Sequence, residues 1–218
     1  MMTVELIGHT VNPDGLCGIA AAECTGGKAH AEKALYMAIR SGHDSVAEHA
    51  TFTFHINGVS RALLAQLTRH RIASYSVRSQ RYCNESYSDK IIPETIAKSE
   101  YADRYARALM EIDALYKDMV NDGIPLEDAR YILPNAETTS LIMTMNAREL
   151  AHFFSLRCCN RAQWEIRQLA DKMLAQCKEV APALFAQAGP PCIRHACQEQ
   201  KPCGNPRASE GHFYDEED

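Results

Sequence analysis

The chain alternates between segments with strand periodicity and segments with helical periodicity, and this alternation limits its fold more than any other feature. Apolar and polar residues alternate in TVELIGHT, residues 3–10, and in ATFTFHING, residues 50–58, while TTSLIMTM, residues 138–145, has the composition of a third strand. Between and after these strands, apolar residues recur at helical spacing. The pattern has no internal repeat and predicts an α/β or α+β fold in one domain.

The helical segments are bounded by glycine, proline and capping residues. Predicted helices cover residues 16–23, 29–41, 61–71, 146–158 and 162–185, together with a long helix that begins at Pro93 and ends before Asn121, and a short one between Pro125 and Pro134. Gly42 is expected to close the second helix and Ser60 to cap the third, and the second strand is expected to stop at Asn57 and Gly58. We expect the long tyrosine-bearing helix, Trp164, Met143 and Met145 to lie in the core.

Composition excludes several classes of protein. The chain has 218 residues, 46% of them hydrophobic, which is enough for one sizeable core, and its formal charge of -5 argues against a protein that coats nucleic acid with its whole surface. No apolar run approaches the roughly 20 residues that span a bilayer, and the N-terminus lacks the pattern of a signal peptide. We therefore expect a cytoplasmic protein with no nucleic-acid or membrane partner, whose nine cysteines are reduced thiols.

The composition changes at residue 190. Residues 1–189 are predicted to form the folded domain, and residues 190–218, rich in Pro, Gly, Cys and charge, to form a C-terminal tail outside the core. The tail contains Cys192, His195, Cys197 and Cys203, which are residue types that bind zinc. Their spacing does not match a common CxxC pair, so we expect no metal, with a zinc site as the alternative.

The segment RHRIASYSVRSQRY, residues 69–82, concentrates cationic donors. From residue 49 to residue 84 there is no acidic residue and no lysine, yet five arginines occur. Arginine makes bidentate hydrogen bonds to phosphate, and the serines of the segment add hydroxyl donors. An anion site and a set of structural salt bridges explain the charge about equally well.

The order of these residues resembles the signature motif of the flavin-dependent thymidylate synthases. Arg69, His70 and Arg71 are followed after seven residues by Ser79, and then by Arg81 and Tyr82. Further matching segments are Gly42 to Ser45, Glu48-His49, Gln66, GIPLEDARYILP with Arg130, MNARELAHFFSLR and RAQWEI. These ordered matches extend from about residue 4 to residue 185.

The resemblance implies a reductive methylation of dUMP to dTMP. The carbon comes from methylenetetrahydrofolate, and the hydride comes from NADPH through FAD. It also implies a single-domain fold with a mixed sheet and long helices, assembled as a homotetramer whose sites are shared between subunits. Two other functions stay open: a nucleotide- or RNA-binding module that uses the same arginines, and an unrelated flavoprotein reductase.

The resemblance also assigns roles to individual residues. Arg157 is expected to lie against the pyrimidine and to favour its ionisation, which makes it the catalytic residue. The residues expected to bind FAD are His43, Ser45, Arg69, His70, Arg71, Val77, Asn146, Arg148 and His152. Those expected to bind dUMP are Gln66, Arg69, Arg78, Ser79, Gln80, Arg81, Arg157 and, from a neighbouring subunit, Arg130.

Each assignment has a structural alternative, and the motif departs from the common pattern in places. His43 could end a helix, Asn146 could be an N-cap, Arg148 and Arg157 could form surface ion pairs, and His152 could be a partly buried histidine. Many members carry Asn-Glu where this chain has Ser76 and Val77, so that no carboxylate is present there and Val77 could contribute only its backbone. Arg78 replaces an apolar residue, and His152 stands where asparagine is common.

Overall fold

A computed structural model describes residues 1–27, 30–193, 197 and 199–207 of the chain. The fold is mixed α/β, as predicted. The expected mixed sheet is wrong, because the four strands form an antiparallel sheet in the order β1-β2-β4-β3. The strands are β1 (Thr3–His9), β2 (Thr51–Ser60), β3 (Ala73–Val77) and β4 (Thr138–Asn146). By its internal contacts the chain divides into two compact units: unit 1 comprises residues 1–3, 56–69 and 76–142, and unit 2 comprises residues 4–55, 70–75 and 143–218. Every strand has residues in both units.

Strands β2 and β4 bury one face, whereas β1 alternates between exposed and half-buried residues. Phe52, Phe54 and Ile56 of β2 are fully buried, and alternate residues of β4, including Met143 and Met145, are buried as well. The predicted end of β2 at Asn57 and Gly58 is wrong, because the strand continues to Ser60 and Gly58 adopts a φ of 70° within it. Strand β3 was not predicted. Its Ala73, Tyr75 and Val77 alternate with exposed Ser74 and Ser76, but the strand is only five residues long and none of its residues is fully buried.

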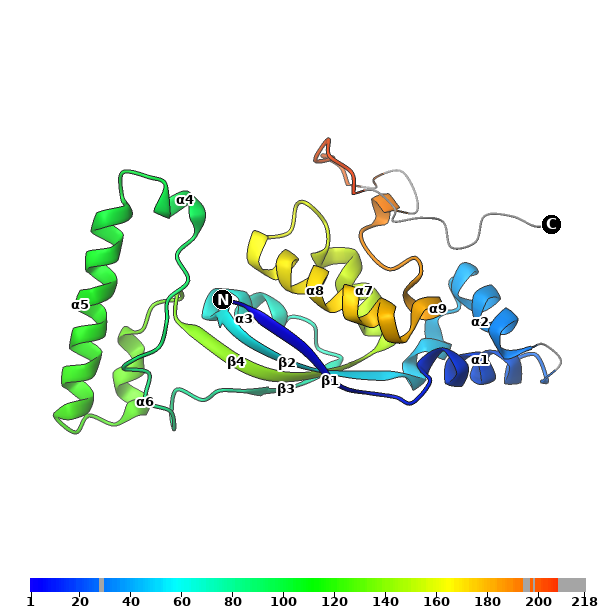
Figure 1. The fold of residues 1–218 in the computed structure, drawn as a ribbon, viewed down its shortest axis with the longest axis horizontal. Coiled ribbons are helices and arrows are strands. Elements are labelled where there is room, and N and C mark those ends of the chain that lie inside the picture. Colours follow the sequence, from blue (N-terminus) through cyan, green and yellow to red (C-terminus); the bar gives the residue numbers. More distant parts are fainter. Residues whose placement is uncertain (28–29, 194–196, 198, 208–218) are drawn as a thin grey trace. The chain divides into compact units, whose positions relative to one another are not determined.

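Unit 2 contains two groups of helices. Helix α1 (Pro13–Glu23) packs on α2 (Ala31–Arg40), and the 3₁₀ helix η1 (Asp44–His49) follows. Gly42 ends α2 as expected, with a φ of 73° and hydrogen bonds from its own N to Ile39 O and from His43 N to Ala38 O. Helices α7 (Ala147–Arg157) and α8 (Trp164–Val180) lie side by side in Figure 1.

The helix predicted for residues 162–185 is two helices. Helix α8 ends at Val180, and α9 (Pro182–Phe185) follows after Ala181, whose φ of -144° and ψ of 63° leave the helical region. The proline explains the break, because its ring cannot continue a helix through the preceding turn. Phe185 of α9 then packs edge-on against Phe52, with ring centroids 5.3 Å apart.

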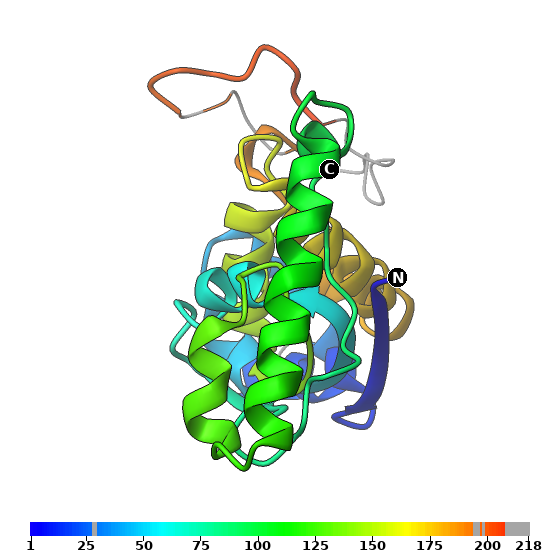
Figure 2. The ribbon, with the colours of Figure 1, turned by 90° about the vertical axis from the view of Figure 1, so that its left-hand side faces the viewer.

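Unit 1 contains α3 (Arg61–Leu67), α4 (Glu94–Ala97), α5 (Ala102–Asn121), α6 (Leu126–Ala129) and the 3₁₀ helix η2 (Arg130–Ile132). Ser60 caps α3 as predicted, accepting from Leu63 N at 3.0 Å, but α3 ends at Leu67 and leaves residues 69–71 outside it. The predicted long helix is divided into α4 and α5, because the Ser99 hydroxyl donates to Ile96 O at 2.8 Å and accepts from Tyr101 N at 3.2 Å. Figure 2 shows α5 beside α6.

The expected core role of the long helix and of Trp164 is only partly right. Leu109 and Tyr116 of α5 are buried, whereas Tyr101 is 59% exposed and Met110 is 71% exposed. Trp164 begins α8 with 36% of its surface exposed. Helix α5 therefore buries Leu109 and Tyr116 and leaves most of its other residues exposed or half-buried.

All nine cysteines are free thiols, as expected. Cys17, Cys158 and Cys177 are buried, and burial raises the pKa of Cys17 to about 11. Among the described residues no group of histidine, cysteine or acidic side chains could hold a metal ion, and His195 lies outside them. No helix in the described part of the chain is both long and apolar enough to cross a membrane.

The described residues after residue 189 form hydrogen bonds and ion pairs with α8 and with the connection between α7 and α8. After the 3₁₀ helix η3 (Pro191–Ile193), Arg207 donates to the carboxylate of Asp171 and, at 2.7 Å, to Cys158 O. Asn160 donates to Asn205 O at 2.7 Å, and Arg161 pairs with Glu199 at 2.8 Å. The division of the chain at residue 189 stays a prediction.

Gly18 offers a test of the packing between α1 and α2. A Cβ at this position would lie 2.6 Å from Ala31 O, which is backbone and cannot swing aside. Gly to Ala in a helix interior ordinarily stabilises by about 1 kcal/mol. We expect Gly18→Ala instead to lower the free energy of unfolding by about 1–3 kcal/mol, because the overpacked helices must separate. Denaturant unfolding measures this change in the free energy of unfolding.

The control for this prediction is Ala106→Gly at an exposed position of α5. It measures the intrinsic helix penalty of glycine in this protein, which should be about 1 kcal/mol. A Gly18→Ala variant that is more stable than the wild type would show that the two helices do not approach as closely as described.

Candidate active site

In unit 2, a buried histidine joins two residues of α7. His70 is 5% exposed, its Nδ1 lies 3.0 Å from Glu149 Oε1, and its Nε2 lies 3.2 Å from Arg157 Nε. The Phe153 ring meets the imidazole edge-on at 4.9 Å between centroids, and the Tyr75 hydroxyl donates to His70 O at 2.9 Å. The imidazole is therefore fixed by its neighbours on both ring nitrogens and on one edge.

The electrostatics of this cluster follow from its burial. Burial lowers the pKa of His70, the hydrogen bond with Glu149 opposes that shift, and the positive charge of Arg157 adds to it. Burial also lowers the pKa of Arg157, and burial together with the charge of Glu149 raises the pKa of Tyr75 to about 12. The cluster thus contains a partly desolvated guanidinium next to a histidine that favours its neutral form.

The other residues of unit 2 assigned to FAD lie on α7 and around η1. Asn146 caps α7, since its Oδ1 accepts from Glu149 N at 2.8 Å, which confirms the structural alternative and leaves its Nδ2 group as a donor. Arg148 is exposed and pairs with Glu48. His43 and Ser45 are exposed at the start of η1, where buried Val46 and Ala47 anchor the segment, and the His152 and Arg71 side chains are exposed too.

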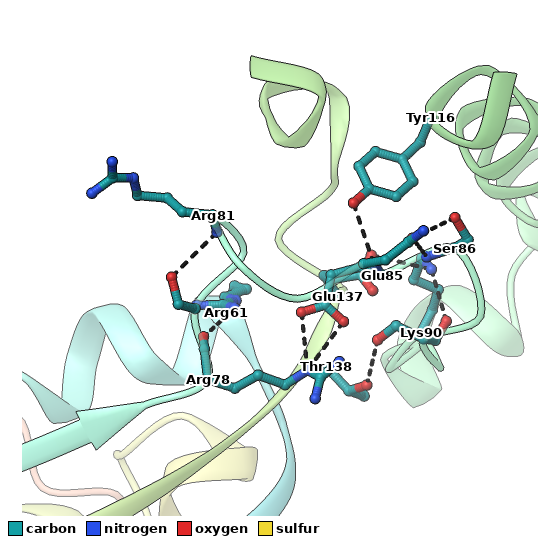
Figure 3. Close-up of polar contacts among 12 residues, drawn as sticks. Arg61, Arg78, Arg81, Glu85, Ser86, Lys90, Tyr116, Glu137 and Thr138 are labelled. Carbon is teal, nitrogen blue, oxygen red and sulfur yellow. Dashed lines mark hydrogen bonds and ion pairs between the residues drawn. The ribbon is translucent and has the colours of Figure 1, made fainter. Parts of the chain in front are cut away.

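In unit 1, the segment that follows β3 is held by a salt bridge (Figure 3). Arg78 donates from Nε to both carboxylate oxygens of Glu85, at 3.1 and 3.3 Å, and this hydrogen bond raises the pKa of Arg78. Arg61 donates to Arg78 O at 3.0 Å, and Arg78 N donates to Ser140 O at 2.9 Å. The side chain, the carbonyl oxygen and the amide nitrogen of Arg78 thus all form hydrogen bonds within unit 1.

Glu85 and Glu137 are carboxylates buried beside this segment. Glu85 is 3% exposed and its backbone N donates to the hydroxyl of Tyr116 at 3.2 Å. Glu137 is fully buried, and Lys90 Nζ lies 3.1 Å from its Oε2 without hydrogen-bond geometry. Burial raises the pKa of Glu137, while Lys90 opposes that shift. Arg78 and Lys90 therefore offset the negative charges of Glu85 and Glu137, two acids that lie outside the acid-free segment of residues 49–84.

The turn after Arg78 carries the residues assigned to the phosphate. Ser79 Oγ accepts from Arg81 N at 3.2 Å, and Ser79 O accepts from Cys83 N at 2.9 Å. The Arg81 guanidinium is exposed and pairs with Glu127 at 2.9 Å, and Arg130 Nε donates to Glu127 O at 3.1 Å. Arg81 and Arg130 thus both contact Glu127 of their own chain. Gln66 is partly exposed in α3, Arg69 is exposed after it, and Val77 and Gln80 are partly exposed beside the turn.

Sequence reasoning named Glu149 only as a possible surface ion-pair partner of Arg148 or Arg157, and it did not find Glu85 or Tyr75. Glu149 is 79 positions from His70, and no local pattern links them. One signal did exist: an Asn followed three residues later by Glu at the start of α7 resembles a capping box, which places Glu149 in the first turn. The pairing of Arg78 with Glu85 is the structural use of arginine that charge alone left open.

The hydrogen bond between Glu85 and Tyr116 can be tested by removing one atom. Tyr116→Phe leaves the buried Glu85 N–H without its partner, so we expect the free energy of unfolding to fall by about 1–3 kcal/mol. The control is Tyr101→Phe, whose side chain is 59% exposed and whose loss of a hydroxyl should change stability little. Equal effects in thermal unfolding of the two variants would contradict the buried bond.

Comparison with known proteins identifies the family. Residues 5–183 match the family model described as thymidylate synthase complementing protein. A flavin-dependent thymidylate synthase of Geobacter sulfurreducens is 45% identical over 212 residues, with 91% of each chain covered. The enzymes of that name from Nitratidesulfovibrio vulgaris (43% identity, 88% of each chain) and Pyrococcus furiosus (48%, 78% of this chain and 73% of that one) are also similar. The chain therefore belongs to the family of flavin-dependent thymidylate synthases.

Proposed function

We propose that this chain methylates dUMP to dTMP, with methylenetetrahydrofolate as the carbon donor and NADPH as the reductant through FAD, and that Arg157 is its catalytic residue. The observation that carries the role of Arg157 is its environment. Its guanidinium is partly buried and is bonded to the imidazole of His70. A desolvated cation of this kind is stabilised when an anion forms next to it.

Arg157 would act on the pyrimidine as a fixed positive charge. Methylation needs a nucleophilic carbon in the uracil ring, and ionisation of the ring makes that carbon electron-rich. A preorganised cation stabilises the negative charge as it develops, and it does so most effectively where water is excluded. No nucleophilic side chain is needed for this step.

We assign the phosphate of dUMP to the turn formed by Ser79, Gln80 and Arg81, with Gln66 and Arg69 as further nucleotide contacts. Arg81 and Glu127 form an exposed pair, with side chains 52% and 50% exposed. Such pairs contribute about 0–1 kcal/mol, so a phosphate can replace the carboxylate at small cost. Arg78 contributes to nucleotide binding indirectly, because its salt bridge to Glu85 holds the turn in place.

The residues that we assign to FAD have chemistry that suits a dinucleotide. Arg69, Arg71 and Arg148 can bind its diphosphate, while His43, Ser45, Asn146 and His152 offer hydrogen bonds and Val77 its backbone. The His70 ring is buried and both of its nitrogens are occupied by Glu149 and Arg157, so we assign it a supporting role in this FAD site. When bound, FAD supplies the hydride transfer that no side chain can perform.

Replacing Arg157 tests the function and its catalytic residue together. We expect Arg157→Ala to lower kcat for dTMP formation by about 100- to 1,000-fold, as loss of a preorganised charge does in other enzymes. The assay combines dUMP, methylenetetrahydrofolate and NADPH with the yellow, FAD-loaded protein and measures dTMP.

The control for that assay is Arg40→Ala, which removes an exposed arginine that donates to the Tyr36 hydroxyl in α2. Undiminished dTMP formation by Arg157→Ala would overturn the assignment. NADPH oxidation without dTMP in the wild type would point to a plain flavin reductase, and salt-dependent binding to long polynucleotides without retained flavin would point to a nucleic-acid module.

We also propose that the chain forms a homotetramer in which Arg130 reaches the nucleotide of a neighbouring subunit. The test mixes two inactive variants, Ser79→Ala and Arg130→Ala, after dissociation and reassembly. If sites are shared, some contain both intact residues and activity returns in the mixed oligomers. Mixed oligomers that stay inactive would count against shared sites.

A further inference from the structure

The bonds of His70 define its protonation. Arg157 Nε carries a hydrogen and can only donate, so the His70 Nε2 that lies 3.2 Å away must accept. In a neutral imidazole the other nitrogen then carries the proton, so Nδ1 donates to Glu149 Oε1 at 3.0 Å. A protonated His70 would present two N–H groups and lose the bond to Arg157.

We propose that Glu149 is a positioning residue for Arg157: through His70 it selects the tautomer that accepts the Arg157 Nε–H and so holds the guanidinium in one orientation. The bond at Nε restricts rotation of the guanidinium about the end of its side chain. The kinetic consequence rests on the proposed function of Arg157, whereas the tautomer of His70 does not.

The placement of Glu149 suits this role. Its backbone N donates to Asn146 Oδ1 at 2.8 Å, which fixes it in the first turn of α7, and it is only 9% exposed. Arg157 is the last residue of the same helix, eight positions later, or about 12 Å at 1.5 Å per residue. The side chains of Glu149 and Arg157 both reach the His70 ring, which comes from a different segment, so one helix carries both ends of the chain of hydrogen bonds.

The neighbours of His70 favour the neutral ring. The titratable and charged groups that act on it are Glu149, Arg157 and His152 of α7, and Tyr75 of β3 bonds to its carbonyl. Burial lowers the pKa of His70 against the opposing effect of Glu149. The carboxylate therefore selects which nitrogen carries the proton without making the ring a cation.

A purely structural role for Glu149 predicts something different. A buried carboxylate needs a hydrogen-bond partner, and any partner would satisfy it. In that case Glu149→Gln lowers stability and leaves the orientation of Arg157 unchanged. The test must therefore include readouts that loss of stability alone does not move.

The first readout is the tautomer itself, measured by solid-state NMR on FAD-loaded protein labelled with ¹⁵N-histidine. We expect the His70 signals, identified by their loss in His70→Gln, to show a protonated Nδ1 and a bare Nε2 at neutral pH. Glu149→Gln should convert them to a mixture. A protonated Nε2 in the wild type would overturn the proposal without any variant having to fold.

Glu165→Gln is the matched control for this measurement. Glu165 is also a buried glutamate in the first turn of a helix, α8, and is 2% exposed. The substitution removes the same charge and should leave the His70 signals unchanged. A change of the His70 signals in this variant equal to that in Glu149→Gln would show a general effect of lost charge and overturn the specific role of Glu149.

The second readout is a double-mutant cycle on kcat for dTMP formation. We expect Glu149→Gln alone to lower kcat about 10- to 100-fold with retained FAD, because a misoriented catalytic group costs that much. In an Arg157→Ala background the same substitution should lower the residual kcat less than twofold. An equal fall in both backgrounds would overturn the proposal. If the wild type makes no dTMP, the proposed function fails, and the tautomer measurement still decides the role of Glu149.

Discussion

The imidazole of His70, held between a carboxylate and a guanidinium of one helix, is the interaction on which the candidate site depends. Its ring is buried, so each of its nitrogens needs a partner, and α7 supplies both of them. Helix α7 starts at an asparagine cap and ends at Arg157, and hydrogen bonds through Glu149 and His70 connect its first turn to the guanidinium at its end. Packing of the Phe153 ring against the His70 imidazole further restricts the position of the imidazole.

The arginines of this chain divide into two kinds. Arg78 forms a salt bridge with the buried carboxylate of Glu85. Burial lowers the pKa of Arg61, while the charges of Glu85 and Glu137 oppose that shift and Arg130 adds to it. Arg81 and Arg148 pair with exposed acids, which a ligand phosphate can displace. Arg78 therefore has the structural role that one explanation of the charge predicts, and the role of Arg81 in binding an anion remains our proposal.

The sequence predicted the longer strands and missed the short one. Strands β2 and β4 bury alternate side chains and β1 alternates over seven residues, whereas β3 has only five residues, none of them fully buried. The division between α4 and α5 depends on the Ser99 hydroxyl, a residue that a helix tolerates. In the site, motif order predicted His70 and Arg157, but Glu149 could not be linked to them, because only tertiary folding brings residues 70 and 149 together.

The C-terminal segment closes a loop back onto the body of unit 2 through Arg207 and Asp171. The described contacts of residues 199–207 with the rest of unit 2 are ion pairs and hydrogen bonds, so a protease cut before residue 199 would leave this segment without a covalent link to the preceding chain. Its release would uncover the Cys158 carbonyl and the Asp171 carboxylate together. Affinity tags or fusions attached at the end of the chain therefore act on a segment that completes the surface beside α8, and their linkers need enough length to leave Arg207 in place.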